Sequence, residues 1–439
     1  MLHLLALVDY CTGAIRRHHG SDDCPIVLAQ YVFEVKFGLF HCGVAAGERL
    51  RRRSPPTVKI FFTVECGFMR FTATVTCATI LVSPSEPALR QPRHFDSPST
   101  LQEESMSHAT VNRFASKTIA FHEIPIIDIA GLVDGSDVEA VARRIGQACE
   151  QVGFFYVKNH GVPSELVKRM YAATEEFFGL PDEAKNNVHI EKSGPTARGY
   201  IPPFAENADP QNNVDLKEAF DYAAKQDRVS PFFGPNLMPA ELPEFEITCD
   251  EYYAAMRTLA GHLVRAFAIS LGLPADYFER MQTDPITIQR LLHYPPQDPT
   301  ANDNTIGIGA HTDKGILTIL SQDNVGGLQV QNKDGEWISA PPVEDAFVIN
   351  IGDLVQLMTN GKYSSTIHRV VNESGAGRYS VAFFIDLDFD ALVETVPTCV
   401  DADHPANPAP FTCGEYKSKW FMNVYPHLKD GLESVSVNG

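Results

Sequence analysis

The stretch Gly309-Ala310-His311-Thr312-Asp313 decides how this 439-residue chain is interpreted. It lies in a strand-like part of the chain, where residues two positions apart point to the same side, so His311 and Asp313 can reach one ion. A third candidate ligand, His368, lies in a second strand-like segment, 364–370. Two imidazoles and one carboxylate on one face of a metal leave the opposite positions open, as non-haem Fe(II) requires. The sequence therefore predicts iron held by His311, Asp313 and His368.

A candidate anion-binding pair follows ten positions after His368, in Arg378-Tyr379-Ser380. On a strand the guanidinium and the hydroxyl point the same way and can hold a carboxylate. An ion pair with an internal acidic side chain is the alternative for Arg378. Tyr294 could donate to the same ligand, although a core tyrosine stays an open alternative. Arg290 is equally compatible with a substrate contact and with a structural carboxylate.

Composition and charge restrict the partners. The chain is 44% hydrophobic and 21% charged, which is typical of a globular protein. Its net charge of −19 argues against nucleic acid and anionic membranes. The apolar segment 58–82 contains three charged residues, so a membrane-spanning helix is rejected. Nine cysteines without a CxxC pair predict reduced thiols. We expect a cytoplasmic protein with a small-molecule substrate, and its oligomeric state stays open.

The first 105 residues differ from the rest. They hold five of the nine cysteines and a basic run at Arg51-Arg52-Arg53, and they end in a polar stretch with several prolines. We treat residues 1–105 as an unassigned leader, either disordered or an artefact of the gene model with Met106 as the true start. A small β-rich unit around 60–82 is the alternative.

Periodicity beyond this point predicts helices packed on a β-rich core. An edge strand is expected at 124–129 and another strand at 154–157. Helices are expected at 138–152, from about 164, and at 249–271, the first preceded by a Ser136–Glu139 capping box. Residues 190–245, rich in Pro, Gly and Asn, are expected to be loop. Asp215, Lys217 and Glu218 could form a polar cluster near the pocket mouth, but a solvated face is the simpler interpretation.

From residue 287 onward the period changes to two. Strands are expected at 287–294, 309–321, 328–332, 337–339, 346–351 and 378–386, followed by a closing helix after the Thr412–Glu415 capping box. The pattern favours an α+β protein with a mostly β core of the jelly-roll type and flanking helices.

These motifs together resemble the non-haem Fe(II)- and 2-oxoglutarate-dependent oxygenases of the isopenicillin N synthase-like family. The resemblance covers about residues 120–430. The segments that carry it are Gly309-Ala310-His311-Thr312-Asp313, Gly326-Gly327-Leu328-Gln329-Val330, Asn350-Ile351-Gly352-Asp353, Ser365-Thr366-Ile367-His368-Arg369-Val370 and Arg378-Tyr379-Ser380. It implies a double-stranded β-helix with an N-terminal oxygenase unit at 120–235, a jelly-roll core at 281–395, and a C-terminal helix and tail at 396–439.

The resemblance also implies site roles. His311, Asp313 and His368 would ligate Fe(II), while Arg378 and Ser380, with Tyr294 assisting, would hold the distal carboxylate of 2-oxoglutarate. O₂ would be the oxidant and ascorbate a candidate reductant. Oxidation of a small molecule, by hydroxylation, desaturation or a related step, would release succinate and CO₂. Loops at 194–213 and 220–233 would line the substrate pocket. The family's Asn-Tyr-Tyr-Pro is Leu292-His293-Tyr294-Pro295 here, so only the second Tyr is retained.

Other functions remain open at this level. An iron oxidase could use Arg378 and Ser380 for a substrate carboxylate, and an ethylene-forming enzyme could decompose 2-oxoglutarate itself. A non-catalytic binding module on the same fold is an alternative of another class. A zinc hydrolase is disfavoured because it has no need for the Arg-x-Ser pair.

Overall fold

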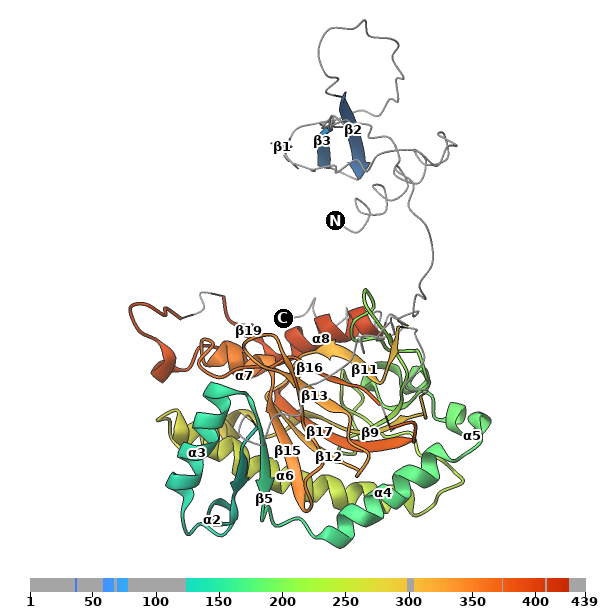
Figure 1. Ribbon diagram of the computed structural model, residues 1–439, viewed down its shortest axis with the longest axis vertical. Coiled ribbons are helices and arrows are strands. Elements are labelled where there is room, and N and C mark those ends of the chain that lie inside the picture. The colour runs from blue at the N-terminus through green and yellow to red at the C-terminus, as the bar shows by residue number, and fades with distance from the viewer. Residues whose placement is uncertain are drawn as a thin grey trace, which may run out of the picture. The chain divides into compact units, whose positions relative to one another are not determined.

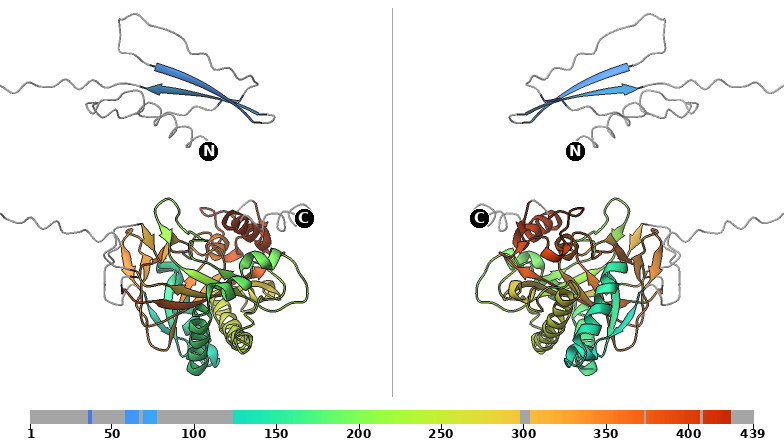
Figure 2. Two further views of the ribbon diagram at one scale, coloured as in Figure 1. Left: turned by 90° about the vertical axis from the view of Figure 1, so that its right-hand side faces the viewer. Right: turned by 90° about the vertical axis from the view of Figure 1, so that its left-hand side faces the viewer.

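The computed structural model describes residues 36–37, 58–66, 69–77, 124–297, 304–372, 374–406 and 409–425. The chain divides into two compact units, Met1–Ser107 and His108–Gly439. In the first unit, β2 (Val58–Cys66) and β3 (Met69–Cys77) form an antiparallel hairpin, and β1 (Lys36–Phe37) pairs with β3 (Figure 2). The hairpin lies where the β-rich alternative for residues 60–82 places it. The other expectations for residues 1–105 lie outside the described residues.

Two sheets build the second unit (Figure 1). The larger sheet has eight strands in the order β4 (Ile126–Asp128), β5 (Phe154–Lys158), β15 (Ala346–Ile351), β12 (Leu317–Gln322), β17 (Arg378–Asp388), β9 (Pro285–Tyr294), β8 (Glu218–Tyr222) and β6 (Gly199–Ile201). The smaller sheet has the order β11 (Ile308–His311), β16 (His368–Val370), β13 (Leu328–Gln331) and β14 (Trp337–Ser339). Within these two sheets, all neighbouring strands pair antiparallel except β4 and β5. The expected edge strand is confirmed, since β4 ends the larger sheet.

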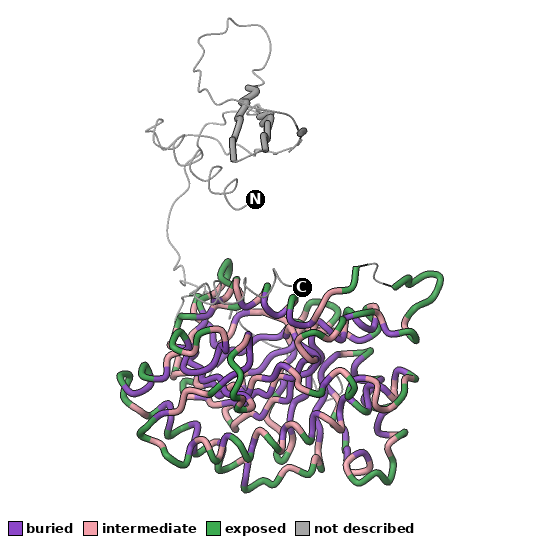
Figure 3. Tube along the Cα trace, turned by 180° about the vertical axis from the view of Figure 1, so that it is seen from behind, coloured by how far each residue is buried: buried purple, intermediate pink, exposed green. Residues whose placement is uncertain are grey.

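One hydrophobic core joins the two sheets. Leu328 and Val330 of the smaller sheet and Ile319 and Phe383 of the larger one are all buried in it. Figure 3 shows buried residues concentrated along the strands and exposed residues along the outer turns of this unit.

Helices cover the sheets on two sides (Figure 1). On one side lie α3 (Val138–Gln151), α4 (Ser164–Phe178) and α6 (Phe245–Ser270), of which α6 packs against β12 and β17. On the opposite side lie α7 (Asp353–Met358) and α8 (Cys413–Val424). Within the described residues, no helix combines the length and the apolar character that crossing a bilayer demands.

Short elements complete the described chain. They are α2 (Ala130–Val133), α5 (Asp182–Asn187), η1 (Ile190–Thr196), β7 (Val214–Asp215), η2 (Glu279–Met281), β10 (Thr305–Ile306), β18 (Leu392–Val393), η3 (Pro397–Cys399) and β19 (Phe411–Thr412). Strands β7 and β10 pair in parallel. Because β10 comes directly before β11 in the sequence, this pair borders the strand that carries His311.

Three expectations are wrong. Residues 190–245 are not simply loop, because they contain β6, β7 and β8. β8 is buried on both faces between β9 and β6, so its sequence shows no alternation. The stretch 309–321 is two strands, because the chain turns at Gly315, where a Cβ would collide with the Asp386 carboxylate. The helix at 138 begins after Asp137 without a side-chain cap, so the Ser136 capping box does not form.

Candidate metal centre

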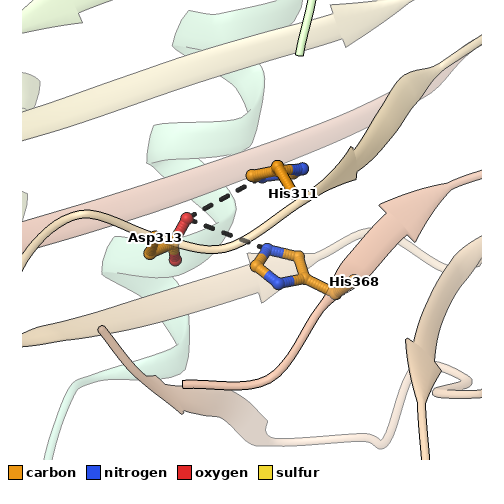
Figure 4. A group of neighbouring side chains, drawn as sticks. All are labelled: His311, Asp313 and His368. Atoms are coloured by element: carbon orange, nitrogen blue, oxygen red, sulfur yellow. Dashed lines mark ion pairs between the residues drawn. The ribbon is translucent and has the colours of Figure 1, made fainter. Parts of the chain in front are cut away.

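The strands β11 and β16 bring the three predicted ligands together. His311 ends β11, His368 begins β16, and the two are paired across the strands. Asp313 lies two residues beyond the end of β11. One ligand atom from each residue lies within 4.8 Å of the others. The Nε2 atoms of both imidazoles are 3.8 Å from Asp313 Oδ1, and Figure 4 shows all three side chains pointing toward one another. The sequence prediction of a shared site is consistent with this geometry.

Backbone carbonyls orient the two imidazoles. His311 Nδ1 lies 2.8 Å from the Gly309 carbonyl oxygen, and His368 Nδ1 lies 3.1 Å from that of Thr366. A carbonyl oxygen can only accept a hydrogen bond, so each Nδ1 carries the proton. Each Nε2 therefore presents its lone pair to the point between the three side chains.

The Asp313 carboxylate is held through one of its oxygens. Oδ2 accepts hydrogen bonds from the Thr318 hydroxyl at 2.5 Å and from the Asn350 amide at 2.7 Å. Oδ1, the oxygen that faces both imidazoles, is left for a cation. The backbone N–H of Asp353, at the start of α7, donates to the Asp313 carbonyl at 2.8 Å and fixes the turn.

Protonation states suit a cation. Burial and, to a smaller extent, the neighbouring His368 lower the pKa of His311 to about 4. Burial alone would raise the pKa of Asp313, but His368, His311 and the two hydrogen bonds outweigh it and lower that pKa. Neutral imidazoles and an ionised carboxylate are the forms that bind a metal. The donor set, two nitrogens and one oxygen, fits Fe(II) with open positions.

Arg378 is fully buried at the start of β17. Its Nε donates to the Gly326 carbonyl at 2.5 Å, Nη1 donates to Ser380 Oγ at 3.1 Å, and Nη2 donates to Gln322 Oε1 at 3.3 Å. Among the described residues, no carboxylate lies within ion-pair distance of this guanidinium, so the internal ion pair that was its alternative is not seen. A buried cation without a counter-charge is costly, and an anionic ligand would relieve that cost. The site therefore fits 2-oxoglutarate.

Tyr294 and Arg290 lie on β9 beside this site. Tyr294 pairs with Arg378 across the strands, and its ring lies 4.6 Å from the guanidinium carbon. Arg290 instead binds two carboxylates, those of Asp221 and Glu206. Of the two roles considered for Arg290, the structure shows the one with structural carboxylates.

The solvated interpretation of Asp215, Lys217 and Glu218 is wrong, because all three are buried. Glu218 points to one side of β8 and bonds Lys185 at 2.8 Å and His293 at 2.7 Å. Asp215 and Lys217 line a cavity on the other side. These charged residues lie in a segment rich in Pro, Gly and Asn, where the sequence has no periodic pattern that could show whether they are buried or exposed.

A cavity of about 510 Å³ reaches His311 and Asp313. One wall is charged, and α8 forms much of another through Lys417, Trp420, Phe421 and Val424. Of the two loops expected to line a pocket, 194–213 contributes three residues and 220–233 contributes none. Sequence reasoning missed α8 as a cavity wall, although the spacing of three, four and seven along one helix face was a usable signal.

Comparison with known proteins places this site in a family. Residues 124–241 match the model described as the non-haem dioxygenase in morphine synthesis N-terminal domain, and residues 285–387 match that of the 2OG-Fe(II) oxygenase superfamily. A homoarginine-6-hydroxylase of Oryza sativa subsp. japonica is 38% identical over 299 residues, which cover 64% of this chain and 90% of that protein. The chain belongs to the 2OG-Fe(II) oxygenase superfamily.

Two further relatives of this oxygenase show the breadth of the family. A 1-aminocyclopropane-1-carboxylate oxidase of Dictyostelium discoideum is 35% identical over 318 residues, covering 64% of this chain and 86% of that one. The crystal structure of a full-length Neurospora crassa protein in complex with α-ketoglutarate and thymine superposes with a TM-score of 0.63 at 28% identity, covering 69% of this chain and 97% of that one. The expected jelly roll, oxidoreductase class, Fe(II) and 2-oxoglutarate are confirmed, as is a small-molecule substrate.

Proposed function

We propose that His311, Asp313 and His368 are the iron ligands of this oxygenase, and that Arg378 and Ser380, with Tyr294 assisting, hold the distal carboxylate of 2-oxoglutarate. The observation that carries the assignment is the convergence of three ligand atoms within 4.8 Å. The proposed role of Arg378 in binding 2-oxoglutarate is supported by its buried guanidinium, which has no carboxylate partner in the described part of the chain.

The chain's own residues prepare the reaction. When bound, iron would activate O₂, which is the oxidant, and the four electrons that O₂ takes up would come in equal parts from the substrate and from 2-oxoglutarate, which is released as succinate and CO₂. The Gly309 and Thr366 carbonyls keep both imidazoles in one tautomer. Thr318 and Asn350 hold the carboxylate of Asp313 in one orientation. The apolar part of the cavity excludes water from the reacting C–H bond.

The domain boundaries form part of the proposal. We assign an N-terminal oxygenase unit to 120–235, the jelly-roll core to 281–395, and a C-terminal helix and tail to 396–439, with residues 1–105 as a leader. The family matches at 124–241 and 285–387 support the first two assignments. A cytoplasmic location is supported by the free thiols of Cys149, Cys249, Cys399 and Cys413. The net charge of −19 supports a protein without nucleic-acid or membrane partners.

Substitution of a ligand tests the proposal. His311→Ala or Asp313→Ala should abolish iron-dependent formation of succinate and leave the far-UV circular dichroism and the unfolding midpoint of the metal-free protein nearly unchanged. His404→Ala removes an exposed histidine outside the site and serves as the matched control. Turnover retained by both ligand variants would refute the assignment.

A second candidate function is an iron oxidase in which Arg378 and Ser380 bind a carboxylate of the substrate. The relationship to 1-aminocyclopropane-1-carboxylate oxidase favours keeping it. Succinate release on addition of 2-oxoglutarate separates the two, since only the first function consumes 2-oxoglutarate. Ethylene formation from 2-oxoglutarate alone would instead identify the enzyme that decomposes its cosubstrate.

A further inference from the structure

Five charged side chains of alternating sign form a connected row, of which four line one wall of the cavity and the fifth, Asp221, lies behind it. Arg290 donates to Asp221 through Nε and Nη2, both at 2.7 Å, and to Glu206 at 3.1 and 3.2 Å. Lys217 bridges Glu206 at 3.2 Å and Asp215 at 3.3 Å. The three carboxylates are nearly inaccessible, with relative exposures of 7% or less. Three carboxylates against two cations leave one negative charge in excess.

The other charged residues around the cavity do not cancel this excess. Lys314 pairs with Asp353 at 2.6 Å, and Lys417 pairs with Asp386 at 2.9 Å, each one to one. The metal centre is balanced by itself, because Fe(II) with Asp313 and the 2-oxoglutarate dianion with Arg378 sum to zero. The cavity of the loaded oxygenase therefore retains about one uncompensated negative charge.

This charge faces the cavity rather than the interior of the protein. Glu206 and Asp215 both line the cavity, whereas Asp221 lies behind Arg290. Two backbone N–H groups, those of Gly309 at 2.8 Å and Ala208 at 3.0 Å, donate to Asp215. Gly309 belongs to the strand that carries His311, so the charged wall and the metal centre share one element. Each of these carboxylates has hydrogen-bond partners, but the wall holds one more carboxylate than it holds cations, and a cationic ligand group would balance that excess.

The remaining walls have another character. Ile288, Leu292, Ile308, Phe384, Trp420 and Val424 give the cavity an apolar side. A ligand that fills it therefore needs a charged end and a hydrocarbon body. We infer that the substrate carries a cationic group, an ammonium or a guanidinium, which binds beside Glu206 and Asp215 while its hydrocarbon part lies along the apolar walls. The inference rests on the proposed function and adds the chemical class of its substrate.

Matched pairs of compounds test this inference. The iron-loaded chain is assayed for stimulated succinate formation with L-arginine against L-citrulline, L-lysine against L-norleucine, and phenethylamine against phenethyl alcohol. In at least one pair the cationic member should stimulate about tenfold more than its neutral partner, which is the scale of one buried charged hydrogen bond. Equal stimulation by both members of every pair, or no response to any cation, would overturn the inference.

Variants of the charged wall test whether it causes the preference for cationic compounds. Glu206→Gln should reduce the preference for the cation about tenfold, whereas Lys217→Gln should keep or increase it because it removes a competing cation. Glu183→Gln changes an exposed carboxylate of α5 and should leave the preference unaltered. A preference that survives in Glu206→Gln counts against this placement. The slow decarboxylation of 2-oxoglutarate without substrate is measured in the same proteins. If this decarboxylation occurs but no preference for a cationic compound is found, the proposed function stands and only the inference about the substrate fails.

Discussion

At the scale of single residues, the metal centre depends on side chains that never touch the metal. Asn350 and Thr318 occupy the outer oxygen of Asp313 and so direct the inner oxygen toward the imidazoles. Residues that orient a ligand in this way commonly raise the affinity for the metal by about 10- to 100-fold.

Asn350→Ala should therefore weaken Fe(II) binding by about 10- to 100-fold while the fold is retained. Fe(II) titration of the anaerobic protein measures the affinity, and circular dichroism checks the fold. Asn186→Ala, in α5, serves as the control because the exposed side-chain amide of Asn186 bonds the carbonyl of Asp182, one turn away on the same helix. Unchanged iron affinity in Asn350→Ala would show that Asp313 keeps its orientation without this amide.

Arg378→Ala should weaken 2-oxoglutarate binding by about 1.5–3 kcal/mol, the scale of a hydrogen bond to a charged group. Arg378→Lys should recover part of that loss, because it restores the charge but lacks the planar pair of donors. Calorimetric titration of the metal-loaded protein with 2-oxoglutarate measures both. Equal affinities in all three proteins would mean that another residue holds the cosubstrate.

The sequence predicted the proposed metal ligands better than the residues that we propose for the substrate. His311, Asp313 and His368 follow from a spacing on strands that fixes their direction. The row of charged residues from Asp221 to Asp215 could not be predicted, because its five residues come from three separated segments. Only the folded β8 and β9 bring Arg290 beside Asp221. Residue type alone does not reveal which charges are buried.

At the scale of elements, strand positions were predictable where apolar residues dominate, and one was missed where buried charged residues interrupt them. The strands at 337–339 and 346–351 were predicted with the bounds the structure shows. β8 was missed because ion pairs, rather than apolar side chains, satisfy its buried face. Helix α8 was predicted from its capping box, which the structure contains.

This capping box gives a prediction for α8. Thr412 Oγ1 accepts the N–H of Glu415 at 3.1 Å, and Glu415 Oε2 accepts the N–H of Thr412 at 2.8 Å. Thr412→Ala should lower the free energy of unfolding by about 1 kcal/mol, measured by urea denaturation. Because α8 lines the cavity, KM for the substrate should rise more than kcat falls. Thr258→Ala, within α6 and far from any helix start, is the control, and equal destabilisation by both would argue against a specific cap.

At the scale of the whole molecule, the two compact units and the family matches assign the chemistry to residues after Ser107. A chain that begins at His108 should therefore fold and form succinate from 2-oxoglutarate at a rate close to that of the full chain. Thermal unfolding and turnover of both proteins measure this. A folded but inactive shorter chain would show that the first 107 residues contribute to activity. The intact mass of the protein from its native host tests whether residues 1–105 are present at all.

The pairing of His311 with His368 across β11 and β16 gives a bound ion a mechanical role. An ion at this point acts as a cross-link between two short strands at the edge of the smaller sheet. Occupancy at a hundredfold excess over Kd would add about 2.7 kcal/mol of stability by mass action. Chelation should therefore speed hydrogen exchange at the amides of these two strands before the α6 amides respond. In His368→Ala the same treatment should change nothing, since the cross-link is already lost.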